Sequence, residues 1–462
     1  MAMLTDTQIS DFKAQIRGEI VLPDDPAYDQ VRQIWNAMID RRPAAIVRCA
    51  GAADIRNAIA FARDHDLLLA IRGAGHNIAG NAVCDDGLMI DLSQMRSVRI
   101  DPGARRAYVE PGAILGDLDH EAQAFGLVTP LGINSTTGVA GLTLGGGFGW
   151  LSRKYGLTVD NLLSVDMVTA SGELVHTSAT EKPELFWALR GGGGNFGVVT
   201  LFEFQLHPLG HDILAGLIVF PGEQADAVLS QYRDYVANLP EETNIWVVLR
   251  KAPPLPFLPE EVHGREVVVL AIFHAGDHQQ GQAQIEPLRH FGEPHGEHIG
   301  VMPYCAWQQA FDPLLTPGAR NYWKSHNFTE LSDKALATIV DYSGQLPSEQ
   351  TEMFIGLLGG EISRIDSDAT AYRQRDAQFV LNVHARWEDP SEDQHCVDWA
   401  REFFTATAPF ATGGVYVNFM TEEETERIAA AYGDGYQRLV AVKNQYDPGN
   451  LFRLNQNIKP TD

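Results

Sequence analysis

Apolar residues in the first 200 positions recur in short runs, which predict small strands separated by helices and glycine-rich turns. Ile9, Phe12 and Ile16 have helical spacing, so the chain is expected to open with a short amphipathic helix. Apolar runs at 44–48 and 67–71 flank a helical pattern at 55–62 and predict a βαβ unit. The other elements expected in this half are strands at 88–92, 107–109 and 198–206, a helix at 118–125 and a hairpin at 167–176.

After Pro208 the pattern changes to longer strands that alternate with helices. Strands are expected at 213–220, 245–250, 267–273, 353–358 and 379–387, with helices at 225–239 and after Asp277. Such alternation without glycine loops predicts a sheet that carries helices on one face. A domain boundary is expected near Leu209 and Gly210, and the proline-rich stretch 252–259 is expected to be a surface loop.

Composition and charge exclude several classes of partner. The 462 residues include 35 Lys and Arg against 60 Asp and Glu, a formal charge of −25. This argues against nucleic acid and anionic membranes, which both require clustered positive charge. Four cysteines without a CxxC pair fit a reduced, cytoplasmic setting, and no segment is expected to direct export or to span a membrane.

Glycine is the informative residue type, and three clusters stand out at 73–75, 145–149 and 191–197. Glycine-rich backbone can approach an anion closely through its N–H groups, although such clusters also form tight turns between strands. No cluster continues into the Lys-Ser/Thr of a P-loop, and His76 interrupts the fingerprint of a nicotinamide dinucleotide site. His76 follows Gly-x-Gly at the end of a predicted strand, so its imidazole is expected beside whatever the loop binds.

Several motifs in order resemble the berberine bridge enzyme-like FAD-linked oxidases of the vanillyl alcohol oxidase and p-cresol methylhydroxylase superfamily. They are IRGAGHN at 71–77, GVAGLTLGGGFG at 138–149, RGGGGNFGVV at 190–199, YVN at 416–418 and YDPGNLF at 446–452. The resemblance spans nearly the whole chain. It implies an α+β, two-domain vanillyl alcohol oxidase-type FAD-binding fold with an antiparallel-sheet substrate domain covered by helices. The FAD-binding domain is expected at 1–209, with 425–462 returning to it, and the substrate-binding domain at 210–424.

The resemblance also implies how the cofactor is held. His76 would be bonded covalently to the 8α-methyl group of FAD. Asn134 stands where members with a second covalent link carry cysteine, which implies a single histidyl link. Thr137 stands at the family's gate to oxygen, and its modest size favours an oxidase over a dehydrogenase. The other expected cofactor-binding residues are Ile71, Arg72, Gly73, Ala74, Gly75, Asn77, Gly80, Gly132, Gly138, Gly141, Gly145, Gly146, Gly149, Val198 and Asn418.

Flavin oxidation of a substrate needs a base that removes an O–H or N–H proton. The resemblance implies a reactive tyrosine at Tyr416, which is our first candidate provided that nearby positive charge or the flavin lowers its pKa; packing between domains is the alternative. Strand alternation places Asn382 and His384 on one face, which either lines a ligand pocket or meets solvent. Arg364 replaces a glutamate base of plant members and is a candidate binder of an anionic substrate.

The sequence therefore predicts an FAD-dependent oxidase that transfers a hydride from a small alcohol, sugar or amine to FAD, with O2 then giving H2O2. Within the same family, a flavin-dependent monooxygenase or an oxidative cyclase is the alternative. A non-catalytic FAD-containing binding protein and a nicotinamide dehydrogenase are alternatives of other classes. No metal is expected in the site.

Overall fold

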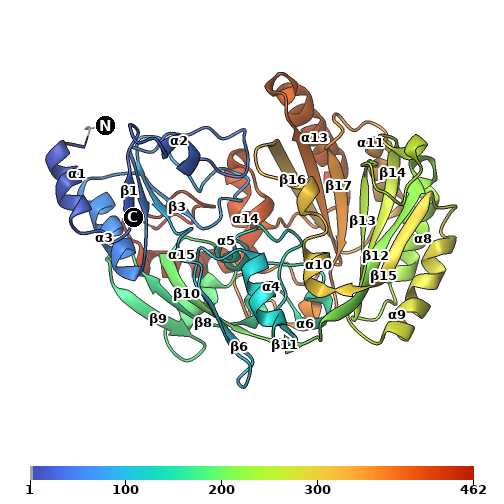
Figure 1. Ribbon diagram of the computed structural model, residues 1–462, viewed down its shortest axis with the longest axis horizontal. Helices are drawn as coiled ribbons and strands as arrows, with labels where there is room; N and C mark the ends of the chain where they lie inside the picture. Colours follow the sequence, from blue (N-terminus) through green and yellow to red (C-terminus); the bar gives the residue numbers. More distant parts are fainter. Residues whose placement is uncertain (1–3, 462) are drawn as a thin grey trace.

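Residues 4–461, which the computed structural model describes, form two β-sheet parts that lie side by side (Figure 1). The N-terminal part begins with a four-stranded sheet in the order β1-β2-β4-β3. Its strands are β1 (Glu19–Val21), β2 (Ala45–Arg48), β3 (Leu69–Arg72) and β4 (Leu88–Asp91). Helix α3 (Ala52–Asp64) joins β2 to β3 as predicted, and β4 inserts between these strands, parallel to both.

A second, antiparallel sheet of the N-terminal part has the order β5-β6-β10-β8-β9. Its strands are β5 (Val98–Asp101), β6 (Arg106–Val109), β8 (Leu162–Val168), β9 (Leu174–Ser178) and β10 (Val198–Gln205). The predicted hairpin is β8–β9, and Gly172 takes a positive φ of 85° in its turn. Strand β5 was not predicted, because two of its four residues are charged.

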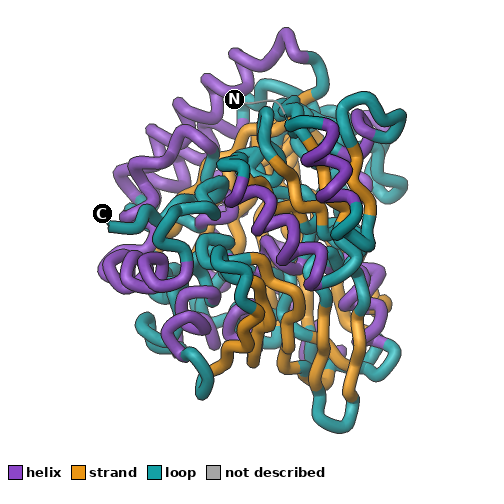
Figure 2. Tube along the Cα trace, turned by 90° about the vertical axis from the view of Figure 1, so that its left-hand side faces the viewer, coloured by secondary structure: helices purple, strands orange, loops and turns teal. Residues whose placement is uncertain are grey.

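Short helices and one small strand pair complete the N-terminal part. The helices are α1 (Asp6–Lys13), α2 (Tyr28–Val31), α4 (Leu115–Gln123), α5 (Val139–Leu144), α6 (Ser152–Tyr155) and α7 (Pro183–Leu189). The strand pair is β7 (Leu127–Val128) with β11 (His207–Pro208). Seen from the side of this part, strands form the middle of the molecule, and helices and loops surround them (Figure 2).

The second part is one seven-stranded antiparallel sheet in the order β15-β12-β14-β13-β17-β18-β16. Its strands are β12 (Asp212–Pro221), β13 (Thr243–Lys251), β14 (Glu266–His274), β15 (Gly296–Pro303), β16 (Arg320–Phe328), β17 (Glu352–Leu357) and β18 (Phe379–Trp387). Strands β15 and β16 were not predicted, because β15 is mostly solvent-accessible and β16 carries many polar residues. Smaller helices of this part are α10 (Tyr304–Gln308) and α12 (Glu361–Arg364).

Helices cover one face of this sheet, as predicted. They are α8 (Ala225–Val236), α9 (His278–Ile285), α11 (Asp333–Ser343) and α13 (Asp393–Thr407). On the covered face, Tyr232 of α8 contacts Phe379, and His326 of β16 stacks on Phe404 of α13. Because side chains alternate along a strand, Trp246, Val248 and their counterparts on other strands form the opposite, open face.

The chain ends in the N-terminal part, where α14 (Ile428–Tyr432) and α15 (Tyr436–Tyr446) lie beside segments from the start of the sequence (Figure 1). Lys443 anchors this return, since its fully buried ammonium is bonded to Asp447 at 2.7 Å and donates to the carbonyl of Asn195. Val415 and Val417 already belong to the core of the N-terminal part, so the return begins before residue 425. The division near residue 209 stays a prediction.

Across residues 4–461, every helix is too short or too polar to cross a membrane.

Candidate active site

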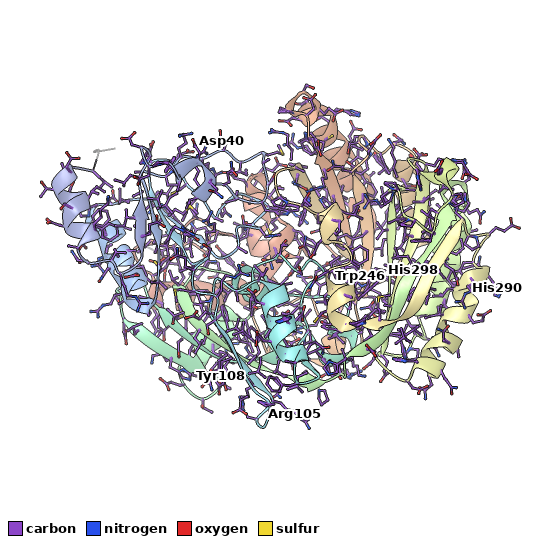
Figure 3. All side chains as sticks on the ribbon, in the orientation of Figure 1. Asp40, Arg105, Tyr108, Trp246, His290 and His298 are labelled. Atoms are coloured by element: carbon purple, nitrogen blue, oxygen red, sulfur yellow. The ribbon has the colours of Figure 1, made fainter. Side chains whose placement is uncertain are left out.

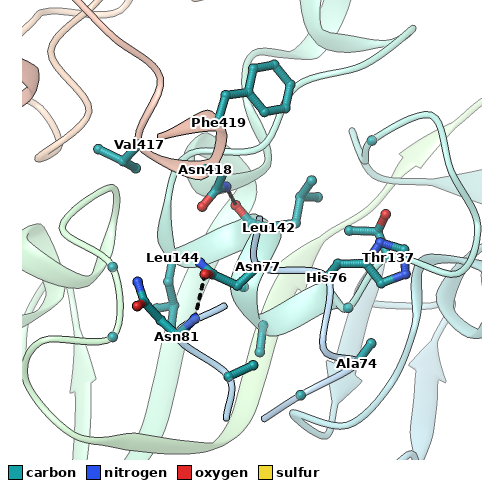
Figure 4. Close-up of a pocket in the computed structure, with 18 of the residues that line it drawn as sticks. Ala74, His76, Asn77, Asn81, Thr137, Leu142, Leu144, Val417, Asn418 and Phe419 are labelled. Carbon is teal, nitrogen blue, oxygen red and sulfur yellow. Dashed lines mark hydrogen bonds between the residues drawn. The ribbon is translucent and has the colours of Figure 1, made fainter. Parts of the chain in front are cut away.

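A cavity of about 320 Å³ separates the glycine loops of the N-terminal part from the open face of the seven-stranded sheet. One wall contains the loop after β3, helix α5 and the segment around Gly193 and Gly194. The opposite wall contains Trp246, Glu352 and His384. Figure 4 shows part of the first wall, where the Asn418 amide donates to the carbonyl of Leu142 at 3.2 Å.

Most of the residues predicted for the site line this cavity, although their contact with a bound cofactor stays a prediction. They are Ile71, Gly73, Ala74, Gly75, His76, Asn77, Gly132, Thr137, Gly138, Gly141, Val198, Asn418, His384 and Tyr416.

Arg72 and Gly80 do not line the cavity, so the structure does not bring them together with the other predicted residues. The Arg72 guanidinium lies in a buried ion pair with Asp91 at 2.6 Å, so it fixes the end of β3 from behind the loop. Gly80 packs on Ile39, and a Cβ at this glycine would lie 2.8 Å from that side chain. Both residues therefore shape the loop.

Three predicted glycines of the second cluster also do not line the cavity. A Cβ at Gly145 would lie 2.2 Å from the Asn418 amide, and one at Gly146 would lie 2.8 Å from Tyr372. A Cβ at Gly149 would lie 2.0 Å from the carbonyl of Leu131. These glycines allow neighbouring segments to pack closely and leave Gly141 of the same segment at the cavity.

Asn382 is the sixth predicted site residue that does not line the cavity. It lies on the open face of β18, two residues before His384, but it is fully buried and does not line the cavity. Its cross-strand neighbours are Ser325 and Phe354. Its amide has no hydrogen-bond partner among the described residues. The alternation that identified its face was correct, but the depth of packing above that face cannot be read from one strand.

The loop after β3 offers free donors to an anion. Within residues 4–461, no backbone N–H of residues 73–77 donates to a protein acceptor. Gly141 and Gly194 face open space, since a Cβ at either position would meet no atom within 4 Å. A cradle of unpaired N–H groups bordered by open glycines fits a phosphate-containing cofactor such as FAD.

His76 is held in one tautomer by two residues of the next wall segment. The Thr136 hydroxyl donates to Asn134 Oδ1 at 2.7 Å, and this same oxygen accepts the Thr136 backbone N–H at 3.0 Å. The hydroxyl oxygen of Thr136 therefore accepts the hydrogen on His76 Nε2, at 3.1 Å. Burial lowers the pKa of His76 to about 4, so at neutral pH its Nδ1 carries a lone pair.

On the opposite wall, the strand register aligns Trp323, His384, Glu352 and Arg250 in a row across four strands. Arg250 Nη1 bonds to Glu352 Oε2 at 2.5 Å, and His384 Nδ1 lies 3.5 Å from Glu352 Oε1. Burial raises the pKa of Glu352, but Arg250, His384 and Arg386 together lower it to about 2. The carboxylate is therefore ionised at neutral pH.

The tautomer of His384 is also set by its neighbours. The Asn321 amide donates from Nδ2 to the carbonyl of Ala319 at 2.9 Å, which fixes its oxygen as the acceptor for His384 Nε2 at 3.0 Å. Burial lowers the pKa of His384, against the opposing effect of Glu352. In its neutral form, His384 therefore presents the Nδ1 lone pair next to the Glu352 carboxylate.

Comparison with known proteins assigns the chain to a protein family. Residues 43–178 match the family model described as "FAD binding domain", and residues 415–459 match the one described as "Berberine and berberine like". The (R)-6-hydroxynicotine oxidase of Paenarthrobacter nicotinovorans is 33% identical over 458 residues, 96% of this chain and 97% of the relative. The chain belongs to the berberine bridge enzyme-like family.

Further comparisons agree with this assignment. The crystal structure of 6-hydroxy-D-nicotine oxidase from Arthrobacter nicotinovorans superposes with a TM-score of 0.87 at 32% identity, covering 96% of this chain and 98% of the other. The chitooligosaccharide oxidase of Gibberella zeae is 28% identical, covering 92% of this chain and 89% of the relative. The predicted family and two-domain α+β fold are confirmed, and the protein is an FAD-linked oxidoreductase.

Tyr416 of this berberine bridge enzyme-like protein is buried and accepts two hydrogen bonds. Its hydroxyl oxygen accepts the backbone N–H of Gly147 at 3.1 Å and the Asn418 amide at 2.9 Å. Burial raises its pKa to about 12, against the smaller effects of those two donors. The phenol therefore keeps its proton at neutral pH, contrary to the lowered pKa on which its prediction as the base depended.

Sequence reasoning missed several residues of the two walls. Glu352 is the polar first residue of β17, and extending the predicted strand by one position would have placed it on the same face as Phe354. Trp35, which stacks on His76 with ring centroids 5.3 Å apart, follows α2 in a region without periodicity. Arg364, the candidate binder of an anionic substrate, pairs with Glu241 and Glu361 and does not line the cavity.

Proposed function

We propose that this protein is an oxidase that transfers a hydride from an alcohol, sugar or amine to FAD held covalently by His76. When bound, FAD supplies the hydride acceptor, and O2 takes the electrons to give H2O2. The observation that carries the proposal is the pair of buried imidazoles, His76 and His384, on opposite walls of one cavity, each with an oxygen acceptor at Nε2 that leaves Nδ1 unprotonated in the neutral form.

His76 is suited to bond formation with the cofactor. Its Nδ1 can attack an electrophilic carbon while Nε2–H stays bonded to Thr136 Oγ1. Joining this nitrogen to the 8α carbon would release one proton and two electrons from the methyl group and leave a positive charge on the imidazole. Loss of the Nε2 proton would then supply the second proton that O2, as the electron acceptor, needs to form H2O2. Asn134, in the position of the second attachment site of other members, has a different part in our proposal, since it directs the Thr136 hydroxyl that orients His76.

His384 is our proposed base. Its Nδ1 is free to accept the O–H or N–H proton of a substrate, and the resulting imidazolium would lie between Asn321 Oδ1 and the Glu352 carboxylate. An ionised carboxylate 3.5 Å away stabilises that cation. Tyr416, with its raised pKa, is assigned to positioning, because it holds Asn418 against the glycine segment.

Relatives leave the substrate range broad, since one is named for a hydroxynicotine and another for chitooligosaccharides. All four cysteines are free thiols, which supports our proposal of a cytoplasmic location.

The test uses the flavin-loaded protein under anaerobic conditions with a panel of alcohols, sugars and amines. We expect one class to bleach the flavin absorbance, and readmitted O2 to restore it with one H2O2 released for each substrate oxidised. Labelled oxygen in the product would favour a monooxygenase. A flavin that the whole panel leaves oxidised would favour a binding protein. After acid denaturation, the yellow colour should stay with the pellet, and its complete release would refute the His76 link.

A further inference from the structure

A small side chamber of about 60 Å³ opens beside the main cavity, at the open face of the seven-stranded sheet. The two spaces share Ile133, Trp246, Leu315, Glu352 and Phe354 as lining residues, so they are neighbours with a common boundary. Figure 3 shows Trp246 near the middle of the molecule, far from His290 at the outer surface. A molecule bound in the main cavity can therefore extend into the chamber across this shared boundary.

The floor of the chamber follows from strand register. One row across the sheet contains Phe354, Val248 and Val269, which are paired through strands β17, β13 and β14. The next row contains Trp246 and Ala271. All five side chains lie on the same face because they share the alternation of their strands. The floor is thus apolar, and the loop residue Leu255 closes one side.

The charged residues at the edge of the chamber are already paired. Arg250 bonds to Glu352 at 2.5 Å and, through Nε, to the carbonyl of Lys251 at 3.2 Å. The Arg250 guanidinium is therefore already paired with a carboxylate and does not require an anionic ligand. Glu352 lies at the boundary, so it separates the polar row around His384 from the apolar chamber.

Aromatic rings are prominent in the walls. Trp150 and Trp246 lie with centroids 4.7 Å apart, Trp246 stacks on Phe354 at 5.4 Å, and Phe311 lies 6.0 Å from Trp150. Such surfaces favour another aromatic ring at similar separations. The hydroxyl groups of a sugar would instead lose their hydrogen bonds to water in this apolar space.

We propose that the side chamber is a substrate subsite for an aryl group. In this inference, which rests on the proposed oxidase function, the ring lies over Val248 and Ala271 while the carbon to be oxidised stays in the main cavity near His384. The substrate class is then an aryl-substituted alcohol or amine, and free saccharides are excluded.

The experiment measures binding without turnover. The probes are phenylacetamide, 3-phenylpropanamide and 4-phenylbutanamide, neutral amides that lack an alcohol or amine group, titrated into the flavin-loaded protein and followed by the flavin difference spectrum. We expect the affinity to rise at least about tenfold along the series once the ring reaches the chamber, as expected for burial of an apolar ring. The same affinity for all three probes would overturn the proposal.

Two variants and one control locate the effect. Ala271→Leu fills the chamber from the floor, and Leu255→Trp fills it from a partly exposed loop, where folding is less at risk. Both should reduce the gain along the series to less than about twofold. Phe257→Trp, in the same loop but outside the chamber lining, should keep the full gain.

Persistence of the gain in both filled variants would refute the subsite. If the gain depends on the chamber but the substrate panel leaves the flavin oxidised, the aryl site stands and the oxidase proposal fails.

Discussion

Replacing Thr136 by Val tests how the protein prepares His76 for attachment of FAD. Valine has nearly the same shape as threonine but lacks the hydroxyl whose oxygen lies 3.1 Å from His76 Nε2. The variant therefore keeps the packing of the segment and removes one acceptor. In our proposal, attack by Nδ1 would place positive charge on the imidazole, and in the parent protein the Nε2–H would then bond to Thr136 with charge assistance.

The magnitude follows from that hydrogen bond. A bond to a charged group contributes about 1.5–3 kcal/mol, whereas a neutral one contributes about 1 kcal/mol. Because the variant loses the neutral bond of the resting state as well, the barrier rises only by the difference, about 0.5–2 kcal/mol, and Thr136→Val should slow covalent attachment about 2- to 30-fold. Noncovalent loading with FAD should change little, because Thr136 does not line the cavity.

The assay uses protein from riboflavin-starved cells, mixed with FAD and sampled over time into denaturant. Covalent flavin is then read as fluorescence of the protein band in a gel. Thr136→Ser keeps the hydroxyl and should keep the parent rate. Asn134→Ala leaves the hydroxyl without its acceptor at 2.7 Å and should give an intermediate rate. Equal rates for the Val and Ser variants would refute our account of the tautomer.

Three further predictions concern the proposed substrate side and the cofactor cradle. His384→Gln should slow flavin reduction about 10²- to 10⁴-fold. In the parent, the anaerobic rate of flavin reduction should fall with decreasing pH as His384 is protonated. This fall should occur below the ordinary histidine pKa, because burial lowers the pKa of His384. The variant should lose this pH dependence, and a variant that keeps it would point to another base. Tyr416→Phe should leave the rate of flavin reduction within about threefold of the parent. It should lower the free energy of unfolding in denaturant by about 1–3 kcal/mol, because the backbone N–H of Gly147 loses its acceptor. A hundredfold slower reduction with unchanged stability would restore Tyr416 as the base. Gly141→Val should place its side chain in the cavity and weaken FAD loading at least about tenfold by steric exclusion, without lowering the unfolding temperature of the FAD-free protein. As a control, Gly300→Val at another open glycine should load FAD normally. Equal loading of both variants would refute the location of the cradle.

Much of the fold was predictable because its elements have strong local signals. The apolar runs at β12, β13 and β14 identify buried strands, and the glycines at 73–75 identify a loop that approaches a ligand. Strand β16 has no such signal, since its polar residues Lys324 and His326 are buried against α13 and the C-terminal segment. Its helix-covered face therefore has a polar sequence, which the alternation rule assigns to solvent.

The candidate site was predictable only where one segment carries the whole pattern. His384 and its face follow from β18 alone. Glu352 precedes it by more than 30 residues, and only the pairing of β17 with β18 places the two side chains together. The Thr136–Asn134 relay depends on a turn whose hydrogen bonds leave no periodicity in sequence. Long-range register and loop geometry are the two kinds of information that a single sequence lacks.

The two imidazoles follow one design on opposite walls. Each is buried enough to stay neutral, and in each an oxygen whose role is already fixed accepts the Nε2 hydrogen: Thr136 Oγ1 for His76 and Asn321 Oδ1 for His384. The segment of Trp35 and Asn36 joins the two supports. Trp35 stacks on His76 and donates its backbone N–H to the carbonyl of Gly75. The Asn36 side chain bonds to both the backbone N–H and the backbone carbonyl of Asn321.

This arrangement couples the spacing of the two walls to the tautomers they present. Moving the sheet away from the cradle would break the two Asn36–Asn321 hydrogen bonds, at 2.9 and 3.0 Å. The backbone carbonyl and the backbone N–H of Asn321 would then both lose their partner. Asn321, whose Oδ1 accepts the Nε2 hydrogen of His384, would then lose the position that keeps His384 Nδ1 unprotonated. In our proposal, this contact between the two parts serves the chemistry directly, because a base and a cofactor held on separate sheets need a fixed distance as well as correct protonation.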